Sequence, residues 1–151
     1  MTDEDRIAVT NNTQTPVGLT KNAGWQIGLR RTLSVPAQVL WDFMLSQDGL
    51  EIWLGMGEPF KFIPGIKYKL FDGTTGEVRV IDKGSQWRIS RKPANPRYER
   101  PSTIQVRIID KADQCTLAFH EEHLPDERSR KIRKTFYLNV MELIKDRLEA
   151  D

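Results

Sequence analysis

A run of about 25 residues near the C-terminus places the tightest limit on what this chain can fold into. From Asp126 to Ala150 the sequence contains neither glycine nor proline. Apolar residues recur there at helical spacing: Ile132, Phe136, Val140, Leu143 or Ile144, and Leu148. A helix of this length measures about 37 Å at about 1.5 Å per residue, enough to cross a small domain. Tyr137 and Met141 widen its apolar face, which indicates a helix clasped by a curved sheet.

The segments before this helix alternate apolar and polar residues with the period of a half-buried strand. The predicted strands are residues 25–35, 67–71, 77–82, 86–91, 102–110 and a sixth through Cys115, Leu117 and Phe119. Two short helices, 36–45 and 47–54, separate the first strand from the second. The short turns favour antiparallel pairing, since a parallel crossover needs about a dozen residues or more. The predicted fold class is therefore α+β, with a curved antiparallel sheet of about six strands around the long C-terminal helix.

The chain of 151 residues fits one domain. Residues 1–22 are polar and are broken by Pro16 and Gly18, so we expect a flexible N-terminal tail. Residues 23–151 are expected to form a single domain.

Charge and cysteine content exclude several classes of protein. Lys and Arg number 23 against 21 Asp and Glu, and the net charge of +2 does not indicate a nucleic-acid partner. Cys115 is the only cysteine, which excludes an internal disulfide and a cysteine-based zinc cluster. No apolar run approaches the roughly 18 residues of a membrane span, and the acidic N-terminus is unlike a secretory signal. We therefore expect a soluble, cytoplasmic protein.

Several blocks of the sequence match one known family in order and spacing. They are Arg31–Pro36 followed by Val39–Trp41, Leu50–Gly55, Gly65–Tyr68 leading to Gly76–Val78, and Tyr137 in the closing helix. Together they resemble the activator of Hsp90 ATPase homologue 1-like domain family of the START/Bet v 1-like (SRPBCC) superfamily. The resemblance covers residues 24–148 and implies the helix-grip fold. It also implies a cavity between sheet and long helix, since this superfamily commonly holds lipids, sterols or aromatic molecules there.

The residues that could carry catalysis or bind a metal are few. The chain has two histidines, and His120-Glu121-Glu122-His123 matches neither order of the zinc-protease motif. In a strand, His120 and His123 would point to opposite faces and could not hold one metal ion. Cys115 lies on the apolar face of its strand, where a thiol behaves as a small hydrophobic group. We predict no catalytic residue, no metal site and no cofactor.

The leading hypothesis is a non-enzymatic module that binds a hydrophobic or amphipathic small molecule. The residues predicted to line its cavity are Trp53, Tyr68, Trp87, Phe119, Tyr137 and Met141. Arg31 breaks the apolar face of the first strand and is the candidate for an acidic head group. Simple core packing for the apolar residues, and an outward-turned or edge-paired side chain for Arg31, are the alternatives.

Two other functions stay open. A protein-interaction or co-chaperone-like module would use the basic start of the long helix, through Arg128, Lys131 and Arg133. A cyclase- or hydrolase-like enzyme is least favoured, because such chemistry needs an acid–base pair in the pocket. The alternation pattern identifies no inward-facing His, Asp or Glu.

Overall fold

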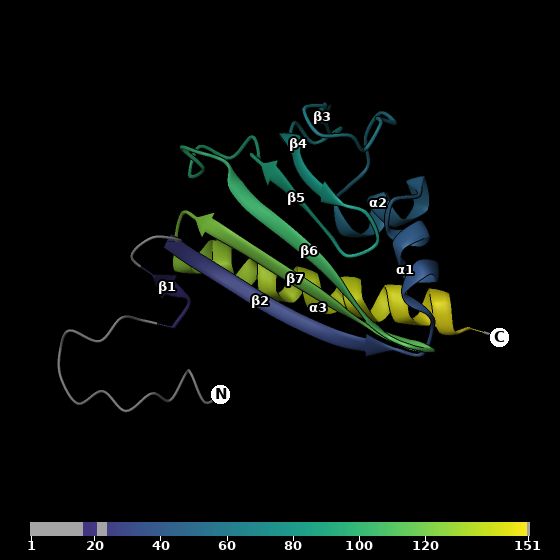
Figure 1. The fold of residues 1–151 in the computed structure, drawn as a ribbon. Helices are drawn as coiled ribbons and strands as arrows, with labels where there is room; N and C mark the ends of the chain where they lie inside the picture. The colour runs from purple at the N-terminus through teal and green to yellow at the C-terminus, as the bar shows by residue number, and fades with distance from the viewer. Residues whose placement is uncertain (1–16, 21–23, 151) are drawn as a thin grey trace, which may run out of the picture.

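The protein is described by a computed structural model that covers residues 17–20 and 24–150 (Figure 1). Its elements in chain order are β1 (Leu19–Thr20), β2 (Gly24–Leu33), α1 (Ala37–Met44), α2 (Gln47–Trp53), β3 (Lys67–Lys69), β4 (Thr75–Asp82), β5 (Gln86–Arg91), β6 (Ser102–Lys111), β7 (Gln114–Leu124) and α3 (Glu127–Glu149). The predicted α+β class, the paired short helices and the long final helix are confirmed. No helix in the described residues has the length and apolar character needed to span a membrane.

All strands pair antiparallel in one sheet of order β1-β2-β7-β6-β5-β4-β3. The described residues form seven strands, one more than expected. The additional strand is β1, in which Leu19 pairs with Trp25 at the start of β2. This strand belongs to the predicted tail, whose residues 1–16 and 21–22 lie outside the described residues.

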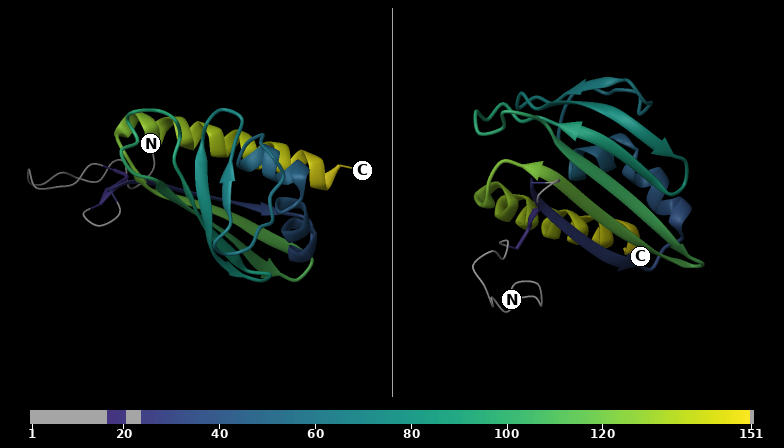
Figure 2. Two further views of the ribbon diagram at one scale, coloured as in Figure 1. Left: turned by 90° about the horizontal axis from the view of Figure 1, so that it is seen from above. Right: turned by 60° about the vertical axis from the view of Figure 1, so that its left-hand side comes forward.

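Helix α3 lies along β2 and β7 on the concave face of the sheet (Figures 1 and 2). Asp126 caps its first turn, with Oδ1 accepting a hydrogen bond of 2.7 Å from the Ser129 amide. The buried residues of α3 are Ser129, Arg133, Tyr137, Val140, Met141 and Ile144. Of the alternatives Leu143 and Ile144, Ile144 is the buried residue. Ile132, which we expected on the buried face, is 56% exposed. The prediction is wrong there because Ser129 and Arg133, both polar, occupy the inward positions of the first two turns.

The two faces of the central sheet carry different residues. Leu117 and Phe119 of β7 point into the interior and are buried, whereas Ala118 and His120 between and after them face outward. The short helices α1 and α2 cover the interior beside β6 and α3 (Figure 1). Ser46 starts α2 by accepting a hydrogen bond of 3.1 Å from the Gly49 amide.

Candidate functional site

Aromatic rings fill the interior between α2, β5 and β7. Trp53 of α2 and Trp87 of β5 are fully buried, with ring centroids 5.6 Å apart. Phe62, from the segment between α2 and β3, lies 5.7 Å from Trp87 and 6.4 Å from Trp53. Phe119 lies 6.4 Å from Trp53 on the β7 side. Three of the predicted lining residues therefore belong to one cluster of contacting rings.

The two buried indoles differ in their hydrogen bonding. Trp53 Nε1 donates to the carbonyl oxygen of Met44 at 2.8 Å. Trp87 Nε1 is buried and has no hydrogen-bond partner among the described residues. Trp41 and Phe62 meet the Trp87 ring edge to face, at 5.1 and 5.7 Å. They offer only π faces, which accept hydrogen bonds more weakly than oxygen does. An unsatisfied buried donor of this kind costs about 1–3 kcal/mol.

Tyr68 closes the ring cluster toward the sheet edge. Its hydroxyl donates to the carbonyl oxygen of Ser90 at 2.6 Å, and its ring stacks on Phe60 at 5.3 Å. Gly76 on the neighbouring strand makes this placement possible. A Cβ atom there would lie 2.1 Å from the Ser90 oxygen and 2.4 Å from the Tyr68 ring. Burial raises the pKa of the Tyr68 phenol, so this hydroxyl stays protonated.

A buried network of polar groups surrounds Glu121 at the end of β7. Its Oε1 accepts hydrogen bonds from Arg133 Nε and from the Tyr137 hydroxyl, both at 2.7 Å. Its Oε2 accepts from Ser102 Oγ at 2.5 Å and from Arg91 Nη1 at 3.2 Å. Arg133 Nη2 donates to the Tyr137 hydroxyl at 3.0 Å. The carboxylate is fully buried and has four donors, which satisfy its lone pairs.

The two arginines keep Glu121 ionised. Burial alone would raise the pKa of its carboxyl, but Arg133, and then Arg91, outweigh burial and lower the pKa to about 2. Burial would lower the pKa of Arg133, and Glu121 raises it above its ordinary value. Burial raises the pKa of Tyr137, which therefore donates as a neutral phenol. Since Glu121 has four donors and is held charged, the network resembles an ion cluster more than a general acid or base.

The aromatic cluster and the polar network are continuous. Phe119 stacks on Tyr137 at 4.6 Å, and the Tyr137 hydroxyl belongs to the network. Arg91 uses only Nη1 in the hydrogen bonds between described residues, and Nη1 also reaches the Tyr98 hydroxyl at 3.4 Å. One carboxylate and two guanidiniums leave a formal charge of +1. The interior therefore has an apolar end at Trp87 and a cationic polar end at Arg91.

Glu121 corrects the expectation that no acidic residue faces inward. It continues the alternation of Cys115, Leu117 and Phe119, so extending that strand by two residues would have found it. The long helix offers a second signal. Arg133 lies four residues before Tyr137, on the same face of the helix.

The remaining predicted ligand residues lie in different environments. Met141 is buried on α3. Arg31 lies on the inward-facing row of β2 but reaches the sheet edge, where its Nη2 pairs with Glu142 Oε1 of α3 at 2.9 Å. The Arg31 side chain is 36% exposed, so the charge of Arg31 is compensated and partly solvated.

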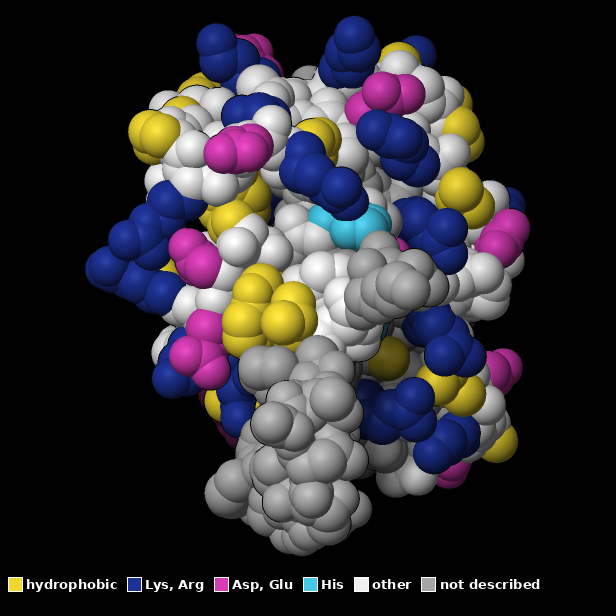
Figure 3. Space-filling view, turned by 90° about the vertical axis from the view of Figure 1, so that its left-hand side faces the viewer, with side chains coloured by type: hydrophobic (Ala, Val, Ile, Leu, Met, Phe, Trp, Pro, Cys, Tyr) yellow, Lys and Arg dark blue, Asp and Glu magenta, His cyan; other side chains and the backbone are white. Residues whose placement is uncertain are grey.

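The basic start of α3 is split between surface and interior. Arg128 and Lys131 are exposed, whereas Arg133 is 6% exposed and pairs with Glu121. The prediction of a surface contact through Arg133 is wrong, because the buried carboxylate draws this side chain under the helix. Figure 3 looks at this end of the molecule and shows Lys and Arg side chains interspersed with Asp and Glu.

The two histidines do not come together as a metal site. His120 faces outward, and its Nε2 lies 2.7 Å from Gln26 Oε1. His123 adopts a left-handed backbone conformation with φ of 64°. In the described part of the chain, no group of three or more His, Cys, Asp or Glu side chains is arranged to hold a metal ion.

Comparison with solved structures identifies the fold. Protein MLL2253 from Mesorhizobium loti superposes with a TM-score of 0.71 at 18% identity, over 83% of this chain and 98% of that one. The chain shares the fold of that protein, a helix-grip fold. An Hsp90 activator from Plasmodium falciparum gives a TM-score of 0.57 at 22% identity, over 66% and 74% of the two chains. The Aha1 dimer from Colwellia psychrerythraea gives 0.64 at 15% identity, over 83% and 96%. No family model and no curated protein matches the sequence.

Proposed function

We propose that the protein binds an apolar or amphipathic small molecule between the sheet and α3. The observation that carries the proposal is the Trp87 indole, whose N–H is buried among aromatic rings and has no acceptor in the described part of the chain. A ligand with a carbonyl or ether oxygen would satisfy this donor, and its apolar body would pack on Trp53 and Phe119. Binding would thus recover the free energy that the unpaired N–H costs.

The route to this position runs beneath residues 57–65. Phe62 occupies the space beside Trp53 and Trp87, so a ligand would enter by displacing its ring. Within this segment, the backbone hydrogen bonds to the rest of the protein lie at its ends. Gly57 forms a bridge with Leu70, and the Gly65 amide donates to the Val78 carbonyl at 2.8 Å. The middle of the segment is held mainly by side-chain packing, which is easier to displace than a strand ladder.

The polar end of the interior supports an amphipathic ligand with an acidic group. The Glu121 network carries a formal charge of +1, and Arg91 has nitrogens beyond Nη1 that bond to no described residue. The Arg91 side chain is 14% exposed, so its charge is only partly solvated. Arg91 is therefore a better anchor for a carboxylate than Arg31, which is already paired with Glu142.

The test compares two ligands of the same shape, acetylnaphthalene and ethylnaphthalene, by tryptophan fluorescence and thermal shift. The wild type should prefer the ketone by about tenfold, the value of one net hydrogen bond. Trp87→Phe should remove the preference while keeping the binding of ethylnaphthalene. Trp53→Phe is the matched control, because the N–H of Trp53 is already satisfied, and should keep the preference. Absence of saturable binding, or an unchanged preference in Trp87→Phe, would refute the proposal.

A second function, protein interaction, is favoured by an exposed apolar surface beside the edge strand β3. Phe71 is 72% exposed and Met56 61% exposed, and the Phe71 amide donates to the Met56 carbonyl at 2.9 Å. Adjacent apolar side chains of this size are typical of partner surfaces. If this surface serves an Aha1-like role, the protein should alter the ATPase rate of purified Hsp90. Replacing both residues by Ser should abolish the change, and charge reversal at Arg128 and Lys131 tests the basic surface separately.

A further inference from the structure

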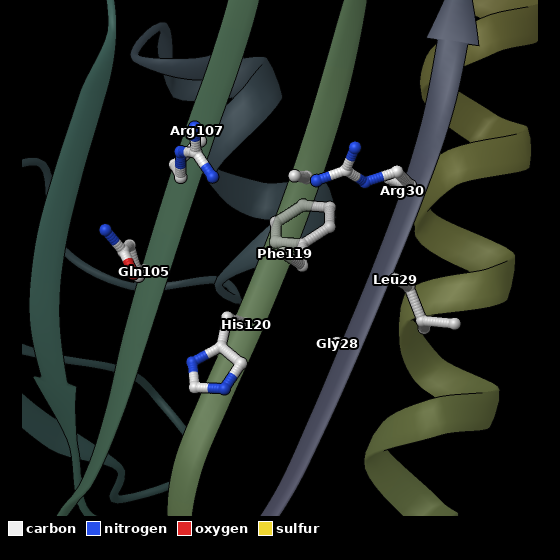
Figure 4. Close-up of a pocket in the computed structure, with 8 residues that line it drawn as sticks. Gly28, Leu29, Arg30, Gln105, Arg107, Phe119 and His120 are labelled. Carbon is white, nitrogen blue, oxygen red and sulfur yellow. The ribbon is translucent and has the colours of Figure 1, made fainter. Parts of the chain in front are cut away.

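The outer face of the sheet, on the side away from α3, carries a hollow of about 530 Å³ across β2, β7 and β6 (Figure 4). Strand register arranges its side chains in two rows: Gly28, His120 and Gln105 in one, and Arg30, Ala118 and Arg107 in the other. Volumes of this size are typical of small-molecule sites. The hollow is separate from the interior, because the neighbouring Phe119 ring points the other way, onto Tyr137.

Small residues create the floor. Gly28 has no side chain, and Ala118 contributes only a methyl group, while longer side chains stand on both sides. A Cβ atom at Gly28 would lie 3.7 Å from the His120 ring and meet nothing closer. The backbone could therefore accept a side chain at this position, so the glycine leaves space rather than relieving a clash.

Unpaired positive charge borders this floor. Arg30 and Arg107 are both paired in register with Ala118, from opposite sides, and both are exposed. Figure 4 shows the Arg30 side chain extending from β2 toward β7, with Arg107 on β6. Neither arginine forms an ion pair with any described residue. Arg88 of β5, which is paired in register with Gln105 of β6, adds a third exposed guanidinium.

Hydrogen bonds hold the polar side chains of the other row in place. Gln105 Nε2 donates to Gln86 Oε1 at 2.6 Å. The side-chain oxygen of Gln105, Oε1, takes no part in this hydrogen bond. His120 Nε2 lies 2.7 Å from Gln26 Oε1. An amide oxygen only accepts, so Nε2 carries the proton and Nδ1 has no partner among the described residues. The Gln105 and His120 side chains are therefore held in place, and each keeps an atom, Gln105 Oε1 and His120 Nδ1, that could bind a ligand.

We propose that this hollow binds a small organic anion with a phosphate or carboxylate group between Arg30 and Arg107. Planar guanidinium groups match the oxygens of such groups and bond to them in bidentate fashion. The apolar body of the ligand rests on Gly28 and Ala118, which carry no long side chain. The proposal concerns the face opposite the interior, so it stands or falls independently of ligand binding beside Trp87.

The test titrates the full chain with phenyl phosphate, phenol and inorganic phosphate, followed by proton–nitrogen correlation spectra and calorimetry. Phenyl phosphate should bind saturably, shift the amide signals of Gly28, Ala118 and His120, and bind more tightly than either fragment. Arg30→Gln and Arg107→Gln should each weaken binding by about tenfold or more, as expected for a charge-assisted bidentate contact. Both side chains are exposed and form no ion pair with the residues that the structure describes, so these variants should fold normally.

Two further variants sharpen the result. Ala118→Leu should block the hollow and abolish binding, whereas Arg79→Gln, an exposed arginine of β4 outside the hollow, should bind like the wild type. The proposal is overturned if phenyl phosphate causes no saturable shifts, or if Arg30→Gln and Arg107→Gln bind it unchanged. Binding of a short single-stranded DNA at these amides, without binding of phenyl phosphate, would also overturn it.

Discussion

Replacing Glu121 by Gln should destabilise the protein far more than a typical carboxylate substitution does. The side chain keeps its shape but loses its charge, so Arg133 and Arg91 remain in the interior without a counter-ion. The new amide also presents donors where Arg133 and Ser102 already donate. Removing one partner of a buried ion pair costs about 3–5 kcal/mol.

The pKa of Glu121 gives an independent magnitude. Folding lowers the pKa of this carboxyl from 4.5 to about 2, because Arg133 and Arg91 outweigh the effect of burial. At about 1.4 kcal/mol per pH unit, this shift corresponds to roughly 3 kcal/mol of stability. Because the folded-state pKa is the lower one, the stabilisation is present above about pH 4.5 and is lost as pH falls toward 2. The free-energy gap between wild type and Glu121→Gln should therefore be about 3 kcal/mol at neutral pH and should close in acid.

Urea unfolding followed by tryptophan fluorescence measures this gap. A loss of about 3 kcal/mol lowers the midpoint by roughly 1–3 M urea, given slopes of about 1–3 kcal/mol per molar. Glu122→Gln is the matched control. Its carboxylate is the next in sequence, is partly exposed and forms no ion pair with a described residue, so it should change stability by less than about 0.5 kcal/mol. A Glu121→Gln variant within about 1 kcal/mol of wild type at every pH would refute this reasoning.

Three other substitutions or reagents probe the fold. Gly76→Ala should cost about 3 kcal/mol or more in urea unfolding, since the added Cβ overlaps a backbone oxygen at 2.1 Å; a near-neutral result would contradict the packing described. Arg31→Gln should cost less than about 1 kcal/mol and the loss should vanish in high salt, because its pair with Glu142 is exposed. Cys115 is buried, and burial raises the pKa of its thiol. A thiol-reactive disulfide reagent should therefore modify Cys115 only at the rate of unfolding. A fast reaction in the native protein would contradict the buried position of this thiol.

The fold was predictable because it rests on periodic apolar patterns. Alternation marked the later strands, and the absence of Gly and Pro after Pro125 marked α3. Strand β1 was not predictable, because two residues are too few to carry a period. The orientation of α3 was predicted one residue out of phase in its first turns, since Ile132 was taken as the inward residue in place of Arg133.

The polar network was missed for a physical reason that particular residues illustrate. A buried carboxylate and a solvated one look the same in a sequence until their partners are known. The ion-pair partners of Glu121 are Arg91, thirty positions earlier in the sequence, and Arg133, twelve positions later. Alternation alone would have placed Glu121 inward, but the predicted strand was followed only through Phe119.

The charge balance of the interior bears on which ligand it would take. Burying three charged groups is expensive, and a well-packed apolar set of similar volume is often as stable or more stable. Glu121 compensates one guanidinium and leaves the second, so the network stabilises itself only in part. The remaining charge lies on Arg91, at the exposed side of the network, where an anionic group could reach it. An amphipathic acid whose carboxylate reached Arg91 would neutralise the remaining charge. An oxygen in its body could also accept a hydrogen bond from Trp87 Nε1. A purely apolar ligand would do neither.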